Sequence, residues 1–174
     1  MTGETDNTSR LMQVVALATK FCSTVENAAQ FEKEEFVRDM TEILPELYLD
    51  FATLEVPQLE EGFYTSDYVD EDYYESMRRG MEGVLGPDDM YLDASADDMK
   101  YSDTPIAVSI SELLADIFQD LYNFVWAVRE TDGAVLNEAY ANCAENFRGV
   151  WAEKLVSVMC PLTRLRFHGF QDNY

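Results

Sequence analysis

The sequence predicts an all-α protein: an antiparallel bundle of five or six helices with an acidic, tyrosine-rich insertion. Three observations support this class. Long segments place apolar residues at three- and four-residue spacings, which is typical of amphipathic helices. Capping residues and Gly-Pro or Asp-Gly steps separate these segments, and short connections between long helices favour antiparallel neighbours. No stretch shows the sustained two-residue alternation that indicates a half-buried strand.

Residues 1–54 are predicted to form the N-terminal helices of a single domain that spans the 174 residues. Thr8 or Ser9 can cap the first helix, because a hydroxyl oxygen there can accept a free amide of the first turn. The second apolar pattern runs from Phe31 to Leu54, with Pro45 inside it. Since proline lacks the amide hydrogen and its ring clashes with the preceding turn, we expect a kink or a break at Pro45.

Residues 55–104 form the predicted acidic insertion. Between Glu55 and Asp103 lie 15 acidic and three basic residues, so this stretch contributes 3 − 15 = −12 to the formal charge of −22, and it holds six of the ten tyrosines. A short helix is expected from Asp70 to Leu85, because Asp70 can cap it and Gly86-Pro87 ends it. The stretch from Asp88 to Thr104 is weakly periodic, which indicates a loop.

Residues 105–174 are predicted to contain the C-terminal helix pair. Pro105–Ile110 is long enough for a brief strand. Ser109-Ile-Ser-Glu112 is a capping box, in which the serine oxygen accepts the amide of the glutamate and the glutamate reaches back. It opens a helix that Thr131-Asp-Gly133 ends.

The last long helix is expected over Ala134–Met159, with Val150 on its apolar face and Pro161 closing it. A short C-terminal piece follows.

The charge and the cysteines limit the classes of partner and compartment. A formal charge of −22 argues against direct binding to nucleic acid and to an anionic membrane, since both require basic patches. No apolar run approaches the roughly 18 residues of a membrane helix. Cys22, Cys143 and Cys160 form no close pair, which indicates reduced thiols. The acidic start lacks the basic region of a secretory signal, so we expect a cytoplasmic protein.

Two motifs carry a resemblance to a known family. Ser109–Leu121 reads SISELLADIFQDL, and Asn146–Leu155 reads NFRGVWAEKL. With Phe21-Cys22 and Leu44-Pro45-Glu46-Leu47-Tyr48, these motifs resemble a bacterial family of small acidic all-helical proteins classed as a domain of unknown function. The resemblance implies an all-α fold and a bacterial cytosolic setting. It implies no activity.

The sequence offers few residues for a catalytic or metal-binding site. A ferritin-like centre needs Glu-x-x-His pairs, but the chain has a single histidine, His168. No nucleotide-binding glycine motif or nucleophile elbow is present, so we expect no cofactor and favour a protein that is not an enzyme. The alternative is a metal-assisted, hydrolase-like enzyme that uses carboxylates of the two C-terminal helices: Glu112, Asp116, Asp120, Glu138 and Glu145. The simpler interpretation of these acids is a solvated helix face.

The leading functional prediction is a non-catalytic interaction or structural protein that binds a basic protein partner. Tyrosine offers a large contact area at low entropic cost, and acids steer a cationic partner. The predicted contact residues are Tyr64, Asp67, Tyr68, Asp70, Asp72, Tyr73 and Tyr74. A minor alternative is a nucleic-acid mimic, in which carboxylates replace phosphates. The plain alternative is that these aromatic residues pack onto the bundle.

Overall fold

The computed structural model describes residues 2–59, 63–93 and 103–169. Residues 60–62 and 94–102 of the predicted insertion, Tyr101 among them, lie outside the described residues. In chain order the elements are α1 (Thr2–Glu26), η1 (Ala28–Gln30), α2 (Lys33–Thr53), α3 (Glu71–Leu85), η2 (Gly86–Asp89), β1 (Met90–Asp93), β2 (Ile106–Ser109), α4 (Ile110–Glu130), α5 (Leu136–Asn146), η4 (Phe147–Trp151) and α6 (Ala152–His168). The predicted all-α class is confirmed, with one two-stranded sheet in the described part of the chain.

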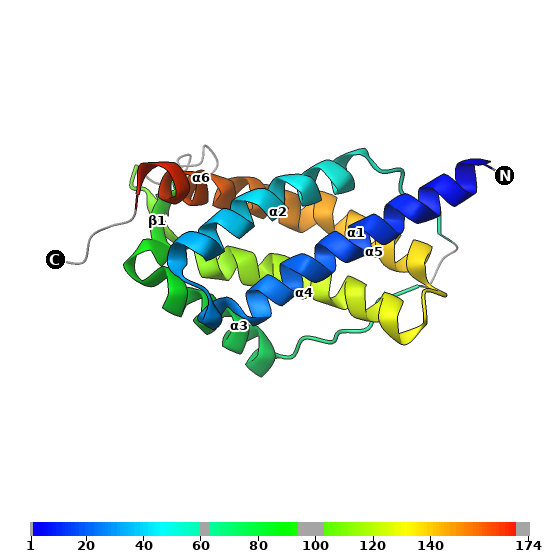
Figure 1. The fold of residues 1–174 in the computed structure, drawn as a ribbon, viewed down its shortest axis with the longest axis horizontal. Coiled ribbons are helices and arrows are strands. Elements are labelled where there is room, and N and C mark those ends of the chain that lie inside the picture. Colours follow the sequence, from blue (N-terminus) through cyan, green and yellow to red (C-terminus); the bar gives the residue numbers. More distant parts are fainter. Residues whose placement is uncertain (1, 60–62, 94–102, 170–174) are drawn as a thin grey trace.

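The long helices lie side by side along the longest axis of the molecule (Figure 1). α1 runs away from the N-terminus, α2 and α4 run back toward that end, and α5 and α6 return. α4 is central, because it packs against α1, α3, α5 and α6, while α2 packs against α1 and α6. Each helix therefore buries one face against at least one antiparallel neighbour, as expected for a bundle.

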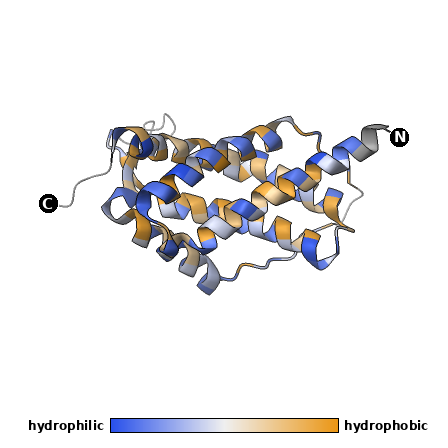
Figure 2. Cartoon of the chain, in the orientation of Figure 1, coloured by the Kyte–Doolittle hydropathy of each residue, from blue (hydrophilic) through white to orange (hydrophobic). Residues whose placement is uncertain are grey.

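One continuous core fills the bundle. Bands of apolar and polar residues alternate along the helices (Figure 2), and the apolar bands supply the buried set. Phe51 of α2 lies at its aromatic centre, with ring centroids 5.4 Å from Tyr140, 5.6 Å from Phe147 and 4.9 Å from Trp151. Fully burying a side chain of this size stabilises the fold by about 1.5–3 kcal/mol. The core is large enough that no metal or disulfide is needed to hold it.

The caps predicted at Asp70 and Ser109 are confirmed, whereas Thr8 and Ser9 lie inside α1 and do not cap it. The Asp70 side chain accepts a hydrogen bond from the Tyr73 amide at 2.8 Å, which caps α3. The Ser109 hydroxyl oxygen accepts one from the Glu112 amide at 3.2 Å, which caps α4. Beyond the end of α4, Gly133 has a φ of 81°, the left-handed conformation that glycine adopts without strain.

The predicted helix end at Pro161 was wrong, and no break is present at Pro45. α2 is unbroken from Lys33 to Thr53 although Pro45 lies inside it, and α6 continues past Pro161 to His168. A proline removes one helical hydrogen bond, which costs about 3 kcal/mol in an isolated helix. Here the buried residues on either side continue the packed face and outweigh that cost: Ile43, Leu44 and Leu47 in α2, and Val158, Leu162 and Leu165 in α6.

The single last helix that was predicted is in fact two helices joined by a π-helical turn. η4 separates α5 from α6 and contains Gly149. A π turn holds more residues than an α turn, so it shifts the helical phase. Phe147 and Trp151 are consequently buried, whereas Val150, predicted for the apolar face, is 52% exposed.

Two boundaries also differ from the prediction. α1 begins at Thr2 rather than near Thr8. The sequence did not indicate this earlier start, because the first turns of the helix are polar and have no apolar face. The predicted loop after Asp88 contains a strand, β1, which pairs antiparallel with β2 so that Met90 lies opposite Ser109. β2 itself agrees with the predicted brief strand over Pro105–Ile110.

Candidate functional site

The seven predicted contact residues lie on the extended segment 63–70 and on the first turn of α3. This segment runs beside α4 (Figure 1). The Thr65 hydroxyl donates a hydrogen bond to Asn142 Oδ1 of α5 at 3.0 Å. Further along, the Tyr68 amide donates to Asn123 Oδ1 of α4 at 2.8 Å. The segment therefore crosses the bundle from α5 to α3, and its backbone is held by side-chain amides of the helices beneath it.

Three of the predicted tyrosines face the bundle rather than a free surface. Each hydroxyl donates to a carboxylate of another helix: Tyr68 to Glu130 at 2.8 Å, Tyr73 to Glu26 at 2.6 Å and Tyr74 to Asp116 at 2.6 Å. Burial, followed by these hydrogen bonds, raises the pKa of Tyr73 and Tyr74 well above the usual value. Both hydroxyls are consequently protonated donors at neutral pH, and they fasten α3 to α1 and α4.

Five rings form an aromatic strip along α4: Tyr68, Tyr73, Phe118, Tyr122 and Trp126. The centroid distances are 6.4 Å from Tyr68 to Trp126, 5.8 Å from Trp126 to Tyr122 and 5.4 Å from Tyr122 to Tyr73. All but Phe118 are half-buried. The Arg129 guanidinium lies 5.8 Å from the centre of the Trp126 ring. The Trp126 indole therefore already binds one guanidinium of its own chain, that of Arg129, by a cation–π contact.

A pocket of about 220 Å³ lies between α1 and α4 beside this strip. We call it the α1–α4 cleft; its lining residues are Thr19, Cys22, Ser23, Glu26, Tyr122, Val125, Trp126 and Arg129. Burial raises the pKa of the Cys22 thiol far above its usual value, so this cysteine is an inert wall of the cleft and not a nucleophile. Glu26 is exposed at the cleft and also receives the Tyr73 hydroxyl. The cleft therefore combines aromatic faces with a carboxylate.

Four exposed acids lie next to the strip, and we call them the acidic rim: Asp67, Asp70, Glu71 and Asp72. Asp67 Oδ1 accepts from the Val69 amide at 3.3 Å, which fixes its position. Tyr64, at 85% exposure, directly precedes Thr65, whose side chain is bound to α5. Of the seven predicted residues, three tyrosines are therefore bonded to the bundle, and Tyr64, Asp67, Asp70 and Asp72 are exposed.

The five carboxylates of the metal-assisted alternative do not converge. Asp116 accepts from Tyr74 and from Lys154 Nζ, the latter at 2.5 Å, and Asp120 accepts from Asn146 Nδ2 at 3.0 Å. Burial raises the pKa of the Asp120 carboxyl. The three glutamates are dispersed: Glu112 is exposed, and Glu138 and Glu145 lie on α5. Across residues 2–59, 63–93 and 103–169, no group of three His, Cys, Asp or Glu side chains could hold a metal ion.

Sequence reasoning missed the structural role of Asp88 and Asp89, which it placed in a loop. Both are buried. Asp88 pairs with Lys33 Nζ at 2.7 Å. Asp89 accepts from the Ser111 amide at 2.7 Å and from the hydroxyls of Ser109 and Ser111 at 2.8 and 2.9 Å. The sequence feature that could have indicated this role is their position directly after Gly86-Pro87, where α3 ends. An acid there can accept amides at the start of the next helix, α4.

Comparisons with known proteins agree with this fold. The chain is similar to the crystal structure of protein BF1032 from Bacteroides fragilis, a structural genomics target, with 28% sequence identity and a TM-score of 0.79 over 94% of this chain and 96% of that chain. No curated protein matches the sequence. No helix in the described part of the chain is long and apolar enough to cross a membrane. The sequence profile of a domain of unknown function, DUF5063, matches residues 5–168, and the protein therefore belongs to the DUF5063 family.

Proposed function

We propose that this is a non-catalytic cytoplasmic interaction protein that binds a basic segment of a protein partner at the α1–α4 cleft and the adjoining acidic rim. The observation that carries the proposal is the stacking of Arg129 on Trp126 beside a carboxylate-bearing cleft. A partner's arginine or lysine would meet the same chemistry there: an aromatic face, an adjacent carboxylate and further acids that attract it from solution.

The distribution of charge supports a cationic ligand. The formal charge of −22 raises the local concentration of cations around the whole molecule. The acidic rim adds four exposed carboxylates on one segment, none of which forms an ion pair with a described residue. By contrast, Glu75 of α3 is occupied by Arg78 and Arg79, at 2.8 and 2.9 Å. Long-range attraction would therefore deliver a basic segment, and the half-buried rings would provide its contact surface.

The test is calorimetric titration of the full chain with a synthetic Lys/Arg peptide at about 0.1 M and about 1 M salt, where the Debye length falls from ~10 to ~3 Å. The first variant neutralises the acidic rim as Asp67→Asn, Asp70→Asn, Glu71→Gln and Asp72→Asn. Asparagine preserves the cap of α3 and the acceptor at position 67. The second variant is Trp126→Leu, which keeps an apolar side chain but removes the π face. A matched control neutralises four exposed acids of α2 and α6 and their flanks: Glu32, Glu34, Glu46 and Glu153.

The proposal expects the rim variant to weaken binding at 0.1 M salt by at least about fivefold more than the control, which removes the same charge. Trp126→Leu should weaken binding by a further two- to fivefold, on the scale of about 0.5–1 kcal/mol for an exposed cation–π contact. Equal losses in the rim and control variants would show attraction to net charge alone. That result, or unchanged binding in Trp126→Leu, contradicts a specific site.

A further inference from the structure

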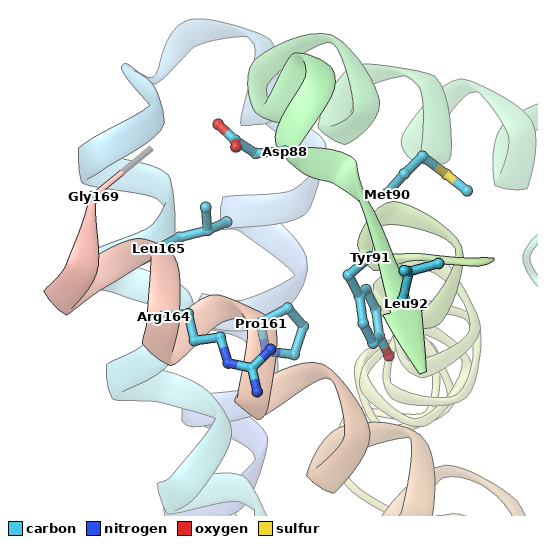
Figure 3. Close-up of a pocket in the computed structure, with 8 residues that line it drawn as sticks. All are labelled: Asp88, Met90, Tyr91, Leu92, Pro161, Arg164, Leu165 and Gly169. Carbon is cyan, nitrogen blue, oxygen red and sulfur yellow. The ribbon is translucent and has the colours of Figure 1, made fainter. Parts of the chain in front are cut away.

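A second pocket lies between β1 and the C-terminal half of α6 (Figure 3). Its volume is about 410 Å³, within the ~300–1,000 Å³ typical of small-molecule sites and enough for roughly a dozen waters. We call it the β1–α6 pocket. Most of its wall is apolar: Met90, the Tyr91 ring, Leu92, Pro161 and Leu165. It lies apart from the α1–α4 cleft in the fold, and the two share no lining residue.

The charges at this pocket differ from those of the rest of the molecule. Asp88, its acidic lining residue, is fully buried and neutralised by Lys33 at 2.7 Å. Arg164 lines the pocket from α6 and is exposed. In the part of the chain that the structure describes, the Arg164 guanidinium forms no ion pair or hydrogen bond, whereas Arg166 two residues later is bound to Glu42 at 3.0 Å. Among the described residues, Arg164 is therefore an unpaired positive group of the pocket in a protein of charge −22, and Asp93 lies at the end of the same strand as Tyr91.

The apolar wall is only partly covered. The Tyr91 ring, Pro161 and Leu165 face the hollow, whereas Met90, 52% exposed, and Leu92, 69% exposed, line it from the outer side of β1 (Figure 3). Figure 3 shows Arg164 beside Pro161 on α6, facing across the hollow toward the Tyr91 ring of β1. An occupant with an apolar body would remove these side chains from water, at about 25 cal/mol per Å² of apolar surface covered. An anionic end on the same molecule would then be within reach of the guanidinium.

We propose that the β1–α6 pocket binds a small amphiphilic carboxylate. The carboxylate pairs with Arg164, and the apolar body lies against the Tyr91 ring, Pro161 and Leu165, with Met90 and Leu92 at its edge. This ligand class follows from charge complementarity: a neutral apolar molecule would leave the guanidinium unused, and a cation would be repelled by it. Carboxylates suit arginine because its planar guanidinium can donate two parallel hydrogen bonds to the two oxygens. The inference does not depend on the function proposed for the α1–α4 cleft.

The test uses octanoate as the probe and octan-1-ol as its neutral counterpart, with the full chain labelled with ¹³C in the methionine methyl groups. Octanoate should shift the Met90 methyl resonance and leave that of Met12, an exposed residue of α1, unchanged. Arg164→Gln should weaken octanoate binding about tenfold, as expected for the loss of a charge-assisted pair, and Arg164→Lys should restore part of it. Lys20→Gln on α1 removes the same charge elsewhere and should leave binding unaltered.

Three results would overturn the proposal: no shift at Met90, equal affinity for octanoate and octan-1-ol, or equal weakening by Arg164→Gln and Lys20→Gln. Leu92→Asp provides an independent check, because position 92 is exposed and a carboxylate there should repel octanoate without disturbing the core. If Leu92→Asp binds octanoate as well as the unmodified chain does, the apolar wall is not part of a site. Neither Arg164→Gln nor Leu92→Asp alters the α1–α4 cleft, so a negative result with octanoate does not affect the test of peptide binding at that cleft.

Discussion

Removal of a single hydroxyl should destabilise the fold at Tyr74 but not at Tyr140. The Tyr74 hydroxyl donates to Asp116 Oδ1 at 2.6 Å, and Asp116 also holds Lys154. A hydrogen bond to a charged group contributes about 1.5–3 kcal/mol. Since this group is only partly buried, water can replace part of the bond in Tyr74→Phe. We therefore expect the free energy of unfolding to fall by about 1.5 kcal/mol, the lower end of that range.

Tyr140 provides the matched comparison. Its side chain is fully buried, and its hydroxyl has no hydrogen-bond partner among the described residues. Burial also raises the pKa of this hydroxyl to about 12, so it is protonated under all ordinary conditions. Tyr140→Phe keeps the ring contacts with Phe51 and Phe124. Because it removes only a desolvated polar atom, we expect unchanged stability or a gain of up to about 1 kcal/mol.

Urea unfolding of both variants and of the unmodified chain, followed by far-UV circular dichroism, measures the difference. The urea midpoint should fall for Tyr74→Phe and stay the same or rise for Tyr140→Phe. The slope of the free energy of unfolding against urea concentration should stay the same, since neither variant alters the surface exposed on unfolding. A loss in Tyr140→Phe as large as that in Tyr74→Phe would refute the reasoning. It would mean that the Tyr140 hydroxyl is satisfied in the folded protein.

Three further predictions concern stability. Gly83→Ala should raise the free energy of unfolding by about 0.5–1 kcal/mol, because Gly83 lies inside α3 with open space around an added Cβ. Gly86→Ala should lower the free energy of unfolding, because φ is +57° at position 86. Chemical denaturation of both variants measures the two changes. Asp120→Asn should be stabilising relative to the unmodified chain near pH 7. Burial raises the pKa of Asp120, so ionisation of this carboxyl lowers the stability of the folded state progressively from about pH 4 up to the folded pKa. The free energies of unfolding of the variant and the unmodified chain, measured from pH 3 to 8, should therefore become equal at the acid end. A constant difference across that range would contradict the assignment. Asp89→Ala should lower the free energy of unfolding by about 3 kcal/mol, because the buried Ser111 amide and two hydroxyls lose their acceptor. A lowered thermal midpoint measures this loss, and Asp103→Ala, at an exposed acid, is the control.

The helices and their caps could be predicted because their signals are local. Apolar spacing, the Ser109 hydroxyl and the Asp70 carboxyl act within one or two turns of their own segment. The errors arose where packing decided the outcome. Pro45 and Pro161 stay within helices because the buried residues before and after each proline pack onto other helices of the bundle. The π-helical turn η4 brings Phe147 and Trp151 onto Phe51, and no local propensity indicates that contact.

The candidate site was only partly predictable for a similar reason. The sequence shows that tyrosines and acids are concentrated together, but it does not show which hydroxyl meets which carboxylate. Tyr73 reaches Glu26 across 47 positions, and Tyr68 reaches Glu130 across 62. The aromatic half of the cleft comes from Tyr122 and Trp126 of α4, which the sequence presented as ordinary bundle residues. The pairing between α1, α3 and α4 is a property of the tertiary fold.

The pairing of tyrosines with acids changes how the acid excess bears on function. Glu26, Asp116 and Glu130 accept hydroxyls that fasten one helix to another, and Asp88 and Asp89 accept groups inside the fold. A tyrosine-rich acidic composition is therefore partly a requirement of this bundle, whether or not a partner binds. Substitution of Tyr73 or Tyr74 would loosen α3 and weaken any interaction indirectly. The acidic rim and Trp126 can be changed without removing a tyrosine–carboxylate bond between helices, so these substitutions can distinguish a binding surface from a structural one.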